Sequence, residues 1–363
     1  MAKAKKNKAT STDVARLAGV SQSTVSMVLN NNHQSFSPET VARVFSACDE
    51  LNYRLPRSNK AGLSDNSKAL LAICPSFVNL HYVTLVESMQ IRAQELGYSL
   101  LTYCTYRNAA AEAGIANMVN RFPVAGALFL YQPASTHVLQ EVSNFVPAVS
   151  MYDKIDETDV DLIEQNSMRL GSIIATHLLE LGHRNIAYIS TPFGDNQLAR
   201  SRRYLGMCGV FEEAGENPDN IIPCTMETEG LTYSADTSEY DTGYQLARHV
   251  VERYPVTAMV GFNDMVALGI MDALLDLKKR IPQDYSVCGC DNTMFSRCKH
   301  VSMTSIETYN NRRGREAVDL LVRKVTQELE PQSIETPVST VRVEYAPRLI
   351  HRASSGVNKR LLK

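Results

Sequence analysis

The residues best placed for chemistry lie near the N-terminal end, in the stretch Thr12–Asn30 (TDVARLAGVSQSTVSMVLN). Its spacing predicts two short helices that meet at Gly19, because glycine easily takes the left-handed conformation that ends a helix. Thr12 and Asp13 are expected to open the first helix, and Ser21 to cap the second. The second helix then turns a polar, uncharged face outward, made of Gln22, Ser23, Thr24, Ser26 and Met27. Such a face suits the edges of bases in a DNA major groove, although an ordinary helical hairpin has the same local pattern.

Apolar residues of this stretch predict a small core, to which a third helix contributes. The first two helices offer Val14, Leu17, Ala18, Val25, Val28 and Leu29. Ser37-Pro38-Glu39-Thr40 is a strong helix start, and an apolar stripe follows it at Val41, Val44, Phe45, Cys48 and Leu51. We expect a three-helix domain over residues 10–52. A core of this size is marginal, so the domain should depend on a partner copy or on DNA.

The charge of the chain is unevenly distributed. The formal net charge is −2, but residues 1–60 hold nine Lys and Arg against four Asp and Glu. Attraction to a polyanion therefore belongs to the N-terminal segment.

From residue 68 the pattern changes, after a Ser-, Asn- and Gly-rich linker predicted at residues 53–67. Apolar strand-like runs alternate with amphipathic helices, as in parallel sheets covered on both faces. About ten such units exceed one comfortable open sheet. The expected fold is therefore a small all-α helix-turn-helix headpiece followed by an α/β core of two doubly wound parallel sheets with a cleft between them.

Several classes of protein are disfavoured by what the sequence lacks. Its eight cysteines form no CxxC pair, which favours free thiols over a metal site. No nucleophile motif, paired-acid spacing, GxGxxG or P-loop argues for an enzyme or a cofactor. The basic start is followed by no apolar signal core, and no run of 18 apolar residues occurs. We expect a soluble cytoplasmic protein with no membrane partner, and a disordered tail after Arg352.

Three collinear stretches together resemble the LacI/GalR family of bacterial transcription repressors. They are TDVARLAGVSQSTVSMVLN with SPETVARVFSACDELNY, LLELGHRNIAYIS with Arg203-Tyr204-Leu205-Gly206, and GFNDMVALGIMDAL with IPQDYSVCGCDNT and MTSIETYNNRRGREAVDLL. The resemblance implies a DNA headpiece, a hinge and a two-lobed core, like a periplasmic sugar-binding protein, at residues 68–350 that forms a homodimer. Its N-lobe would span about 68–165 and 308–333, and its C-lobe about 166–307 and 334–350.

The same resemblance assigns roles in binding a pseudo-palindromic operator. Gln22, Ser23 and Met27 match base-contacting positions, where Gln can pair with adenine and Met can contact a thymine methyl; Met27 has the alternative of a core position. The remaining DNA contacts, mainly to phosphates, would be Thr12, Ser21, Thr24, Ser26 and Asn30.

The linker departs from the family pattern. In the family a short helix after Tyr53 places a leucine in the minor groove, and Leu63 is the nearest candidate here. Because Leu63 follows Gly62 and is shifted by one residue, a plain flexible tether is the alternative to a modified hinge helix.

For the cleft, the resemblance implies a small-molecule effector held by Arg203, Asn263 and Asp291. The guanidinium fork of Arg203 suits paired hydroxyls or a carboxylate, and Asp291 would accept hydrogen bonds. Arg200 and Arg202 are expected to be surface charges, and Asp264 to cap a helix.

Further effector-binding candidates are Ser76, His81, Tyr82, Tyr152, Gln165 and Thr308. Tyr82 or Tyr152 would stack on the ligand, while a lone His81 is as readily structural. This polar set with stacking tyrosines predicts a sugar, with a purine or nucleoside as second choice. A solute-binding protein for a transporter, and a sugar-processing enzyme with a DNA-binding tail, are alternatives from other classes.

Overall fold

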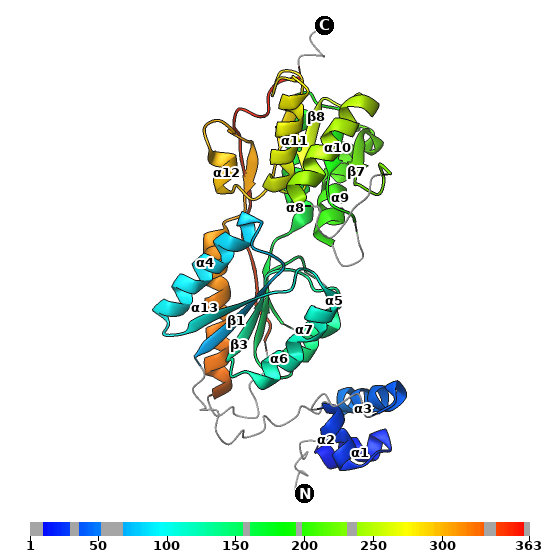
Figure 1. The fold of residues 1–363 in the computed structure, drawn as a ribbon, viewed down its shortest axis with the longest axis vertical. Coiled ribbons are helices and arrows are strands. Elements are labelled where there is room, and N and C mark those ends of the chain that lie inside the picture. Colours follow the sequence, from blue (N-terminus) through cyan, green and yellow to red (C-terminus); the bar gives the residue numbers. More distant parts are fainter. Residues whose placement is uncertain are drawn as a thin grey trace, which may run out of the picture.

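The computed structural model describes residues 10–29, 36–51, 68–154, 160–193, 198–230, 238–329 and 339–358. They form a three-helix headpiece and two α/β lobes (Figure 1). The predicted hinge at 53–67, with Tyr53 and Leu63, lies outside the described residues, as does Asn30.

The headpiece consists of α1 (Ser11–Ala18), α2 (Gln22–Leu29) and α3 (Pro38–Glu50). The first helix begins earlier than predicted, because Thr10 and Asp13 form a reciprocal capping box. Gly19 has φ 66°, as expected for the residue that ends α1. The Oγ of Ser21 accepts from the backbone N of Thr24 at 3.0 Å, so the predicted cap of α2 is confirmed.

The headpiece core differs from the prediction at one position. Its buried residues are Val14, Ala15, Ala18, Val25, Val28, Val44, Ala47 and Cys48. Leu17 was expected among them but is 45% exposed, because α1 turns the face containing Ala15 toward α3. Met27 is also exposed, at 40%, as the outward face of α2 requires.

The N-lobe is a six-stranded parallel sheet with the order β11-β5-β4-β3-β1-β2. Its strands are β1 (Ala69–Cys74), β2 (Ser99–Cys104), β3 (Gly126–Phe129), β4 (Ala148–Ser150), β5 (Asp161–Glu164) and β11 (Arg342–Glu344). Helices α4 (Leu80–Glu95) and α13 (Asn310–Leu329) cover one face. Helices α5 (Ala109–Ala113), α6 (Ile115–Arg121) and α7 (Thr136–Ser143) lie on the other (Figure 1).

The C-lobe repeats this plan with a four-stranded parallel sheet in the order β7-β6-β8-β9. Its strands are β6 (Ile186–Ile189), β7 (Ile221–Cys224), β8 (Ala258–Gly261) and β9 (Ser286–Cys288). Helices α8 (Ser167–Glu180) and α9 (Leu198–Glu213) cover one face, and α10 (Glu239–Arg253) and α11 (Asp264–Asp276) the other. A short 3₁₀ turn η2 (Pro218–Asn220), helix α12 (Met294–Arg297) and an antiparallel pair, β10 (Ser305–Glu307) with β12 (Arg348–Ile350), complete the lobe. Two doubly wound parallel sheets are thus confirmed.

The chain passes between the lobes after β5, after β10 and after β11, and the last passage corrects the predicted lobe boundary. Residues 334–350 were assigned to the C-lobe, but β11 pairs in parallel with β5 of the N-lobe, with Val343 opposite Ile163. Val343 packs against the N-lobe core, which explains why the segment returns to that sheet. Only β12 reaches the C-lobe, where it pairs with β10.

Residues 353–358 of the tail after Arg352 have a defined structure, contrary to the predicted disorder. The Oγ of Ser354 donates to the carbonyl of Val287 at 2.6 Å, and the Nδ2 of Asn358 donates to that of Gly182 at 3.1 Å. Both side chains are buried. Polar residues hold this tail, which is why composition alone did not predict that it packs on the C-lobe.

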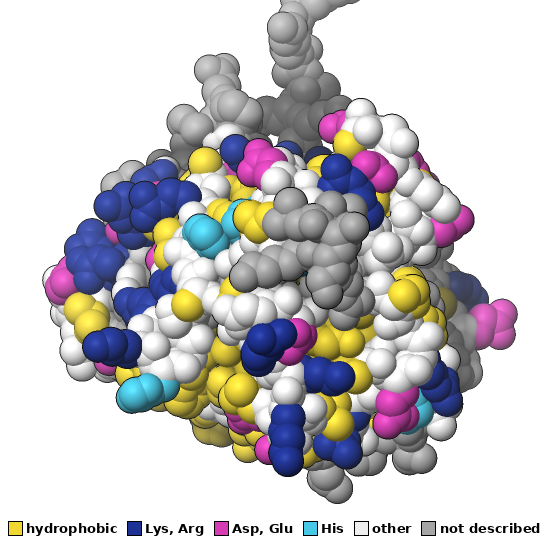
Figure 2. All heavy atoms as spheres, turned by 90° about the horizontal axis from the view of Figure 1, so that it is seen from above, with side chains coloured by type: hydrophobic (Ala, Val, Ile, Leu, Met, Phe, Trp, Pro, Cys, Tyr) yellow, Lys and Arg dark blue, Asp and Glu magenta, His cyan; other side chains and the backbone are white. Residues whose placement is uncertain are grey.

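The cysteines, the apolarity of the helices and the clusters of possible metal ligands bear on the classes of protein that the sequence disfavours. All eight cysteines are free thiols, and among them only Cys298 is exposed. Within the described part of the chain, no helix is long and apolar enough to cross a membrane, and no His, Cys, Asp and Glu cluster suits a metal ion. Seen from the C-lobe end of the molecule, positive and negative side chains are interspersed with hydrophobic ones (Figure 2).

Candidate functional site

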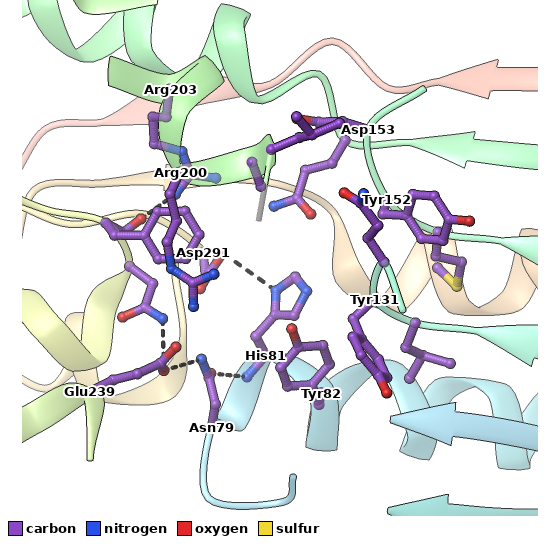
Figure 3. Close-up of a pocket in the computed structure, with 18 of the residues that line it drawn as sticks. Asn79, His81, Tyr82, Tyr131, Tyr152, Asp153, Arg200, Arg203, Glu239 and Asp291 are labelled. Atoms are coloured by element: carbon purple, nitrogen blue, oxygen red, sulfur yellow. Dashed lines mark hydrogen bonds and ion pairs between the residues drawn. The ribbon is translucent and has the colours of Figure 1, made fainter. Parts of the chain in front are cut away.

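A cavity of about 70 Å³ lies between the two lobes, at the carboxyl ends of their strands. Polar side chains from both lobes enter it: His81 and Tyr82 of the N-lobe lie across from Arg200 and Asp291 of the C-lobe (Figure 3). The structure brings together most of the predicted effector residues, namely His81, Tyr82, Tyr152, Gln165, Arg203, Asn263 and Asp291.

Two predicted effector residues do not line this cavity. The Oγ of Ser76 accepts from the backbone N of Val78 at 3.1 Å and so serves the turn before α4. Thr308 is buried where the chain crosses from β10 to α13, and its Oγ1 donates to Asn310 at 3.2 Å. Both are therefore explained by local structure.

Arg203 is 1% exposed and extends from α9 into the cleft. Its Nη1 donates to the carbonyl of Phe262, and its guanidinium lies 4.5 Å from the centroid of the Phe262 ring. The close packing of α8 on α9 fixes this position: a Cβ added at Gly206 would lie 1.9 Å from the carbonyl oxygen of Met168. Arg203 is thus held rigidly, as a group that recognises a ligand by geometry must be.

Arg200 was predicted to be a surface charge, and that prediction was wrong. It is 5% exposed, lines the cavity, and stacks 4.9 Å from the same Phe262 ring. Burial lowers the pKa of Arg200 to about 10, and the charge of Arg107 acts in the same direction. The signal was available, because residues three apart share a helix face and Arg200 therefore accompanies Arg203. Arg202 points elsewhere, and donates to the carbonyl of Lys154 at 2.8 Å.

Asp291 and His81 meet across the cleft. The Oδ1 of Asp291 lies 3.3 Å from the Nδ1 of His81, and both side chains are buried. The Nδ2 of Asn310 also contacts that ring nitrogen, at 3.1 Å. Asp291 has φ 114°, a strained conformation of the kind that accumulates at functional sites.

Asn263 lines the cavity as predicted, but it also caps the helix, the role that was predicted for Asp264. Asn263 is the N-cap of α11, and its Oδ1 accepts from the backbone N of Val266 at 3.0 Å. Its Nδ2 donates to the Oε2 of Glu239 at 2.8 Å, which places it at the cavity edge. Asp264 is not the cap: it is buried, and it accepts from Thr293 N at 2.7 Å and from Ser305 Oγ at 2.5 Å. Burial and the neighbouring Asp291 raise the pKa of Asp264.

The tyrosines differ in how far they are available to a ligand. Tyr152 packs with its ring in the apolar cluster beside Phe129. The ring of Tyr82 meets that of His81 edge-on, with centroids 5.0 Å apart. Tyr131 donates to Glu112 and lies under Arg107, whose guanidinium is 4.9 Å from the ring centroid.

Besides Arg200, sequence reasoning missed seven polar or aromatic lining residues: Asn79, Arg107, Tyr131, Gln132, Asp153, Glu239 and Phe262. Most of them lie in the loops that follow strands, where polar residues are common, so their types alone carried little information. Glu239 opens α10 and gave no local sign that it faces the other lobe.

The headpiece presents the predicted outward face of α2. Gln22, Ser23 and Met27 are exposed, and the Nε2 of Gln22 donates to the Oγ of Ser11 at 2.8 Å. The hydroxyl of Ser21 lies 2.7 Å from that of Ser23 and 2.8 Å from that of Thr24. The side chains expected to read bases are therefore free of the core and partly ordered by their neighbours.

Comparisons with known proteins agree with this arrangement. A family model described as "Bacterial regulatory proteins, lacI family" matches residues 10–55, and one described as "Periplasmic binding protein-like domain" matches residues 175–355. The ribose operon repressor of Escherichia coli K12 is 31% identical over 356 residues, which cover 96% of this chain and 100% of that protein. The HTH-type transcriptional repressor PurR of Pasteurella multocida is 27% identical over 351 residues, covering 95% and 98%. A solved "transcriptional regulator CelR-cellobiose complex" has a TM-score of 0.67 at 25% identity, covering 95% of this chain and 99% of that one.

The chain belongs to the LacI family of bacterial regulatory proteins. It is a DNA-binding transcriptional regulator with a helix-turn-helix headpiece and a two-lobed, periplasmic-binding-protein-like core, as the sequence predicted.

Proposed function

We propose that this regulator is a dimeric cytoplasmic repressor of carbohydrate-utilisation genes, controlled by a sugar bound between its lobes. The observation that carries the proposal is the polar cleft that joins Arg203 and Asp291 to groups from the opposite lobe. Carboxylates and guanidinium groups held rigidly around a small cavity suit the closely spaced hydroxyls of a sugar. One relative is named ribose operon repressor, and a structurally similar regulator was solved as a complex with cellobiose.

A purine effector is the second candidate, because the relatives include proteins named PurR. The stacking surfaces favour a sugar instead. Phe262, an aromatic residue of the cavity wall, already has the guanidinium groups of Arg203 and Arg200 on its ring. Tyr152 packs into the apolar core. A flat base would therefore have to displace charged side chains in order to stack on Phe262.

A thermal-shift screen of sugars and nucleosides, repeated on Asp291→Ala, tests the cleft. We expect a sugar to stabilise the wild type and to lose most of that effect on the variant. Stabilisation by nucleosides alone would select the purine alternative. A ligand whose effect is unchanged in Asp291→Ala would contradict the assignment of the cleft.

For the DNA end we propose that Gln22, Ser23 and Met27 read bases and that Thr12, Ser21, Thr24 and Ser26 contact the phosphate backbone. The exposure of the first three and the positive charge of the N-terminal segment support this division. Asn30, Tyr53 and Leu63 remain sequence-based proposals of DNA contact.

The homodimer would form through the exposed edge of the N-lobe sheet. The edge strand β2 and the neighbouring α4 expose Leu101 and Ile91, each 48% accessible. Exposed apolar side chains next to an unpaired strand edge mark an interaction surface. Leu101→Arg should lower the molecular mass measured by sedimentation and weaken operator binding; an unchanged dimer would exclude this surface.

A further inference from the structure

Two arginines from opposite lobes line the cavity without a carboxylate partner. Arg107 follows β2 of the N-lobe and lies exposed at the mouth, whereas Arg200 is 5% exposed and belongs to α9 of the C-lobe. Among the described residues neither forms an ion pair. Arg107 contacts the hydroxyl of Tyr82 at 3.4 Å, and the Nε of Arg200 has no hydrogen-bond partner.

Among the described residues, no acid that lines the cavity forms an ion pair with Arg107 or Arg200. The Oε2 of Glu239 accepts from the amides of Asn79 and Asn263, each at 2.8 Å. The Oδ1 of Asp153 accepts from the backbone N of Ser167 at 3.0 Å, while its Oδ2 has no hydrogen-bond partner among the described residues, and Asp291 faces His81. A buried guanidinium without a paired carboxylate is costly, and Arg200 bears that cost inside a ligand cavity.

We propose that the effector carries an anionic group, a phosphate monoester or a carboxylate, which binds between Arg200 and Arg107. This rests on the proposed role of the cleft as the effector site, and it narrows the effector to an anionic sugar derivative. The hydroxyl-binding end of the ligand would lie toward Arg203 and Asp291, and its anionic end toward the mouth. The guanidinium fork offers such a group bidentate hydrogen bonds.

The placement also gives the anion a role in closure. Arg107 and Arg200 bring like charges together from different lobes. Burial, and after it the charge of Arg107, lowers the pKa of Arg200, while the charge of Glu239 acts in the opposite direction. Repulsion between these two positive charges opposes closure of the lobes, and an anion bound between them replaces the repulsion with attraction. An anionic ligand would therefore favour the closed arrangement more strongly than its neutral parent does.

Calorimetric titration at constant ionic strength tests this on the full-length protein. The probes are ribose and ribose 5-phosphate, glucose, glucose 6-phosphate and glucuronate, and inorganic phosphate alone. We expect at least one anionic derivative to bind about tenfold or more tightly than its neutral parent, as one charge-assisted contact permits. Whether the phosphate esters or glucuronate gain more distinguishes the two kinds of anion.

The variants Arg200→Gln and Arg107→Gln should each reduce the ratio of the affinity for the anionic derivative to that for its neutral parent toward one. Arg107 is exposed, so its variant stays informative even if Arg200→Gln does not fold. Arg280→Gln, which removes a surface arginine of the C-lobe, is the matched control and should leave the ratio unchanged. Equal binding of parent and anion, or a ratio that survives both variants, overturns the anion subsite and leaves the sugar site intact. No binding by any probe would count against both.

Discussion

At the scale of single residues, Asp291 contributes a charge to the cleft, and Asp291→Asn isolates that charge. Asparagine keeps the size of the side chain and tolerates positive φ, so the backbone conformation at φ 114° should survive. We expect ligand affinity to fall about tenfold to a hundredfold, the range of a lost hydrogen bond to a charged group. Titration of the best ligand from the screen measures this.

Asp284→Asn is the control, because Asp284 pairs with Arg280 on the surface of the same lobe. Equal affinity of Asp291→Asn and wild type would mean that the carboxylate serves the contact with His81 and not the ligand.

Gln22 makes a contrasting residue-scale prediction at the DNA end. Gln22→Ala removes the side chain expected to read a base and should cost about 1–3 kcal/mol on the operator but little on unrelated duplexes. Ser26→Ala, on the same exposed face, should weaken all duplexes alike. Fluorescence anisotropy with specific and scrambled DNA compares them. A uniform loss for Gln22→Ala would show that it acts on the backbone, or through Ser11, to which it donates.

At this scale, a match to a family motif was enough to predict which residues line the cavity, as for Arg203 and Asp291. It failed where the environment decides the role. Arg200 looked like a surface charge, since arginine usually is one, and only the shared helix face places it beside Arg203. Whether Asn263 or Asp264 caps α11 depends on where the helix begins, and boundaries are the least predictable part of a helix.

At the scale of elements, the packing of α8 on α9 supports the site. Gly206→Ala would place a methyl group 1.9 Å from the carbonyl oxygen of Met168, so the helices must separate. We expect a loss of about 1–3 kcal/mol in the free energy of unfolding, together with weaker ligand binding because Arg203 shifts with α9. Gly209→Ala on the same helix meets nothing within 4 Å and should be neutral or slightly stabilising. Similar losses for both variants would contradict this account of the helix pair.

Two histidines that contact the C-terminal tail, His177 and His183, should make the free energy of unfolding depend on pH. His177 lies 2.9 Å from the Oγ of Ser355, and His183 contacts the carbonyl of Gly356 at 3.0 Å. Burial lowers the pKa of His177 to about 4, reinforced by His351, and burial also lowers that of His183. The unfolded chain protonates these rings near pH 6.5, so between about 6.5 and 4 the unfolded state binds more protons. The contribution of these histidines to the free energy of unfolding is therefore fully present above about pH 6.5, and it decreases as the pH falls through this window.

Urea unfolding at pH 7.5 and 5.5 measures the effect as a difference between variants. His177→Gln should lose less stability on acidification than the wild type, although it starts lower because the contact with Ser355 changes. His300→Gln, which removes an exposed histidine of the same lobe, controls for the loss of an imidazole. An equal decrease in the free energy of unfolding between pH 7.5 and 5.5 in wild type and His177→Gln would exclude His177 as a source of the pH dependence.

The elements themselves were largely predictable, because hydrophobic periodicity is local. Strands such as β1 and β8 are nearly continuous apolar runs, and the two parallel sheets followed from their alternation with helices. Which sheet a strand joins, however, can depend on residues that are far away in sequence. β11 has an exposed, polar pattern and joins the N-lobe through pairing with β5, a partner about 180 residues away in sequence, so no periodicity could assign it.

At the scale of the whole molecule, polar contacts cross from one lobe to the other. Asn79, the N-cap of α4, donates to Glu239, and His81 in the first turn of α4 faces Asp291. Arg202 adds a contact with the carbonyl of Lys154. Two of these contacts come from the N-cap and the first turn of α4, next to the proposed ligand. A ligand can shift the lobe angle only by binding one arrangement better than another, and here it would add to contacts that already favour closure.

Glu239→Gln tests this coupling, because it removes the charge that accepts from Asn79 and Asn263 while keeping the side chain's shape. We expect a smaller closed population, and the apparent dissociation constant of the ligand should rise in inverse proportion to it. The ligand concentration for half-maximal change in operator binding should rise likewise, whereas the response at saturation should persist, since Glu239 is not needed once the lobes are closed. Small-angle scattering without ligand should give a larger radius of gyration than the wild type. Glu227→Gln, an exposed acid of the same lobe, is the control. If scattering is unchanged while ligand affinity falls, Glu239 contacts the ligand directly, and closure must depend on His81 and Asp291.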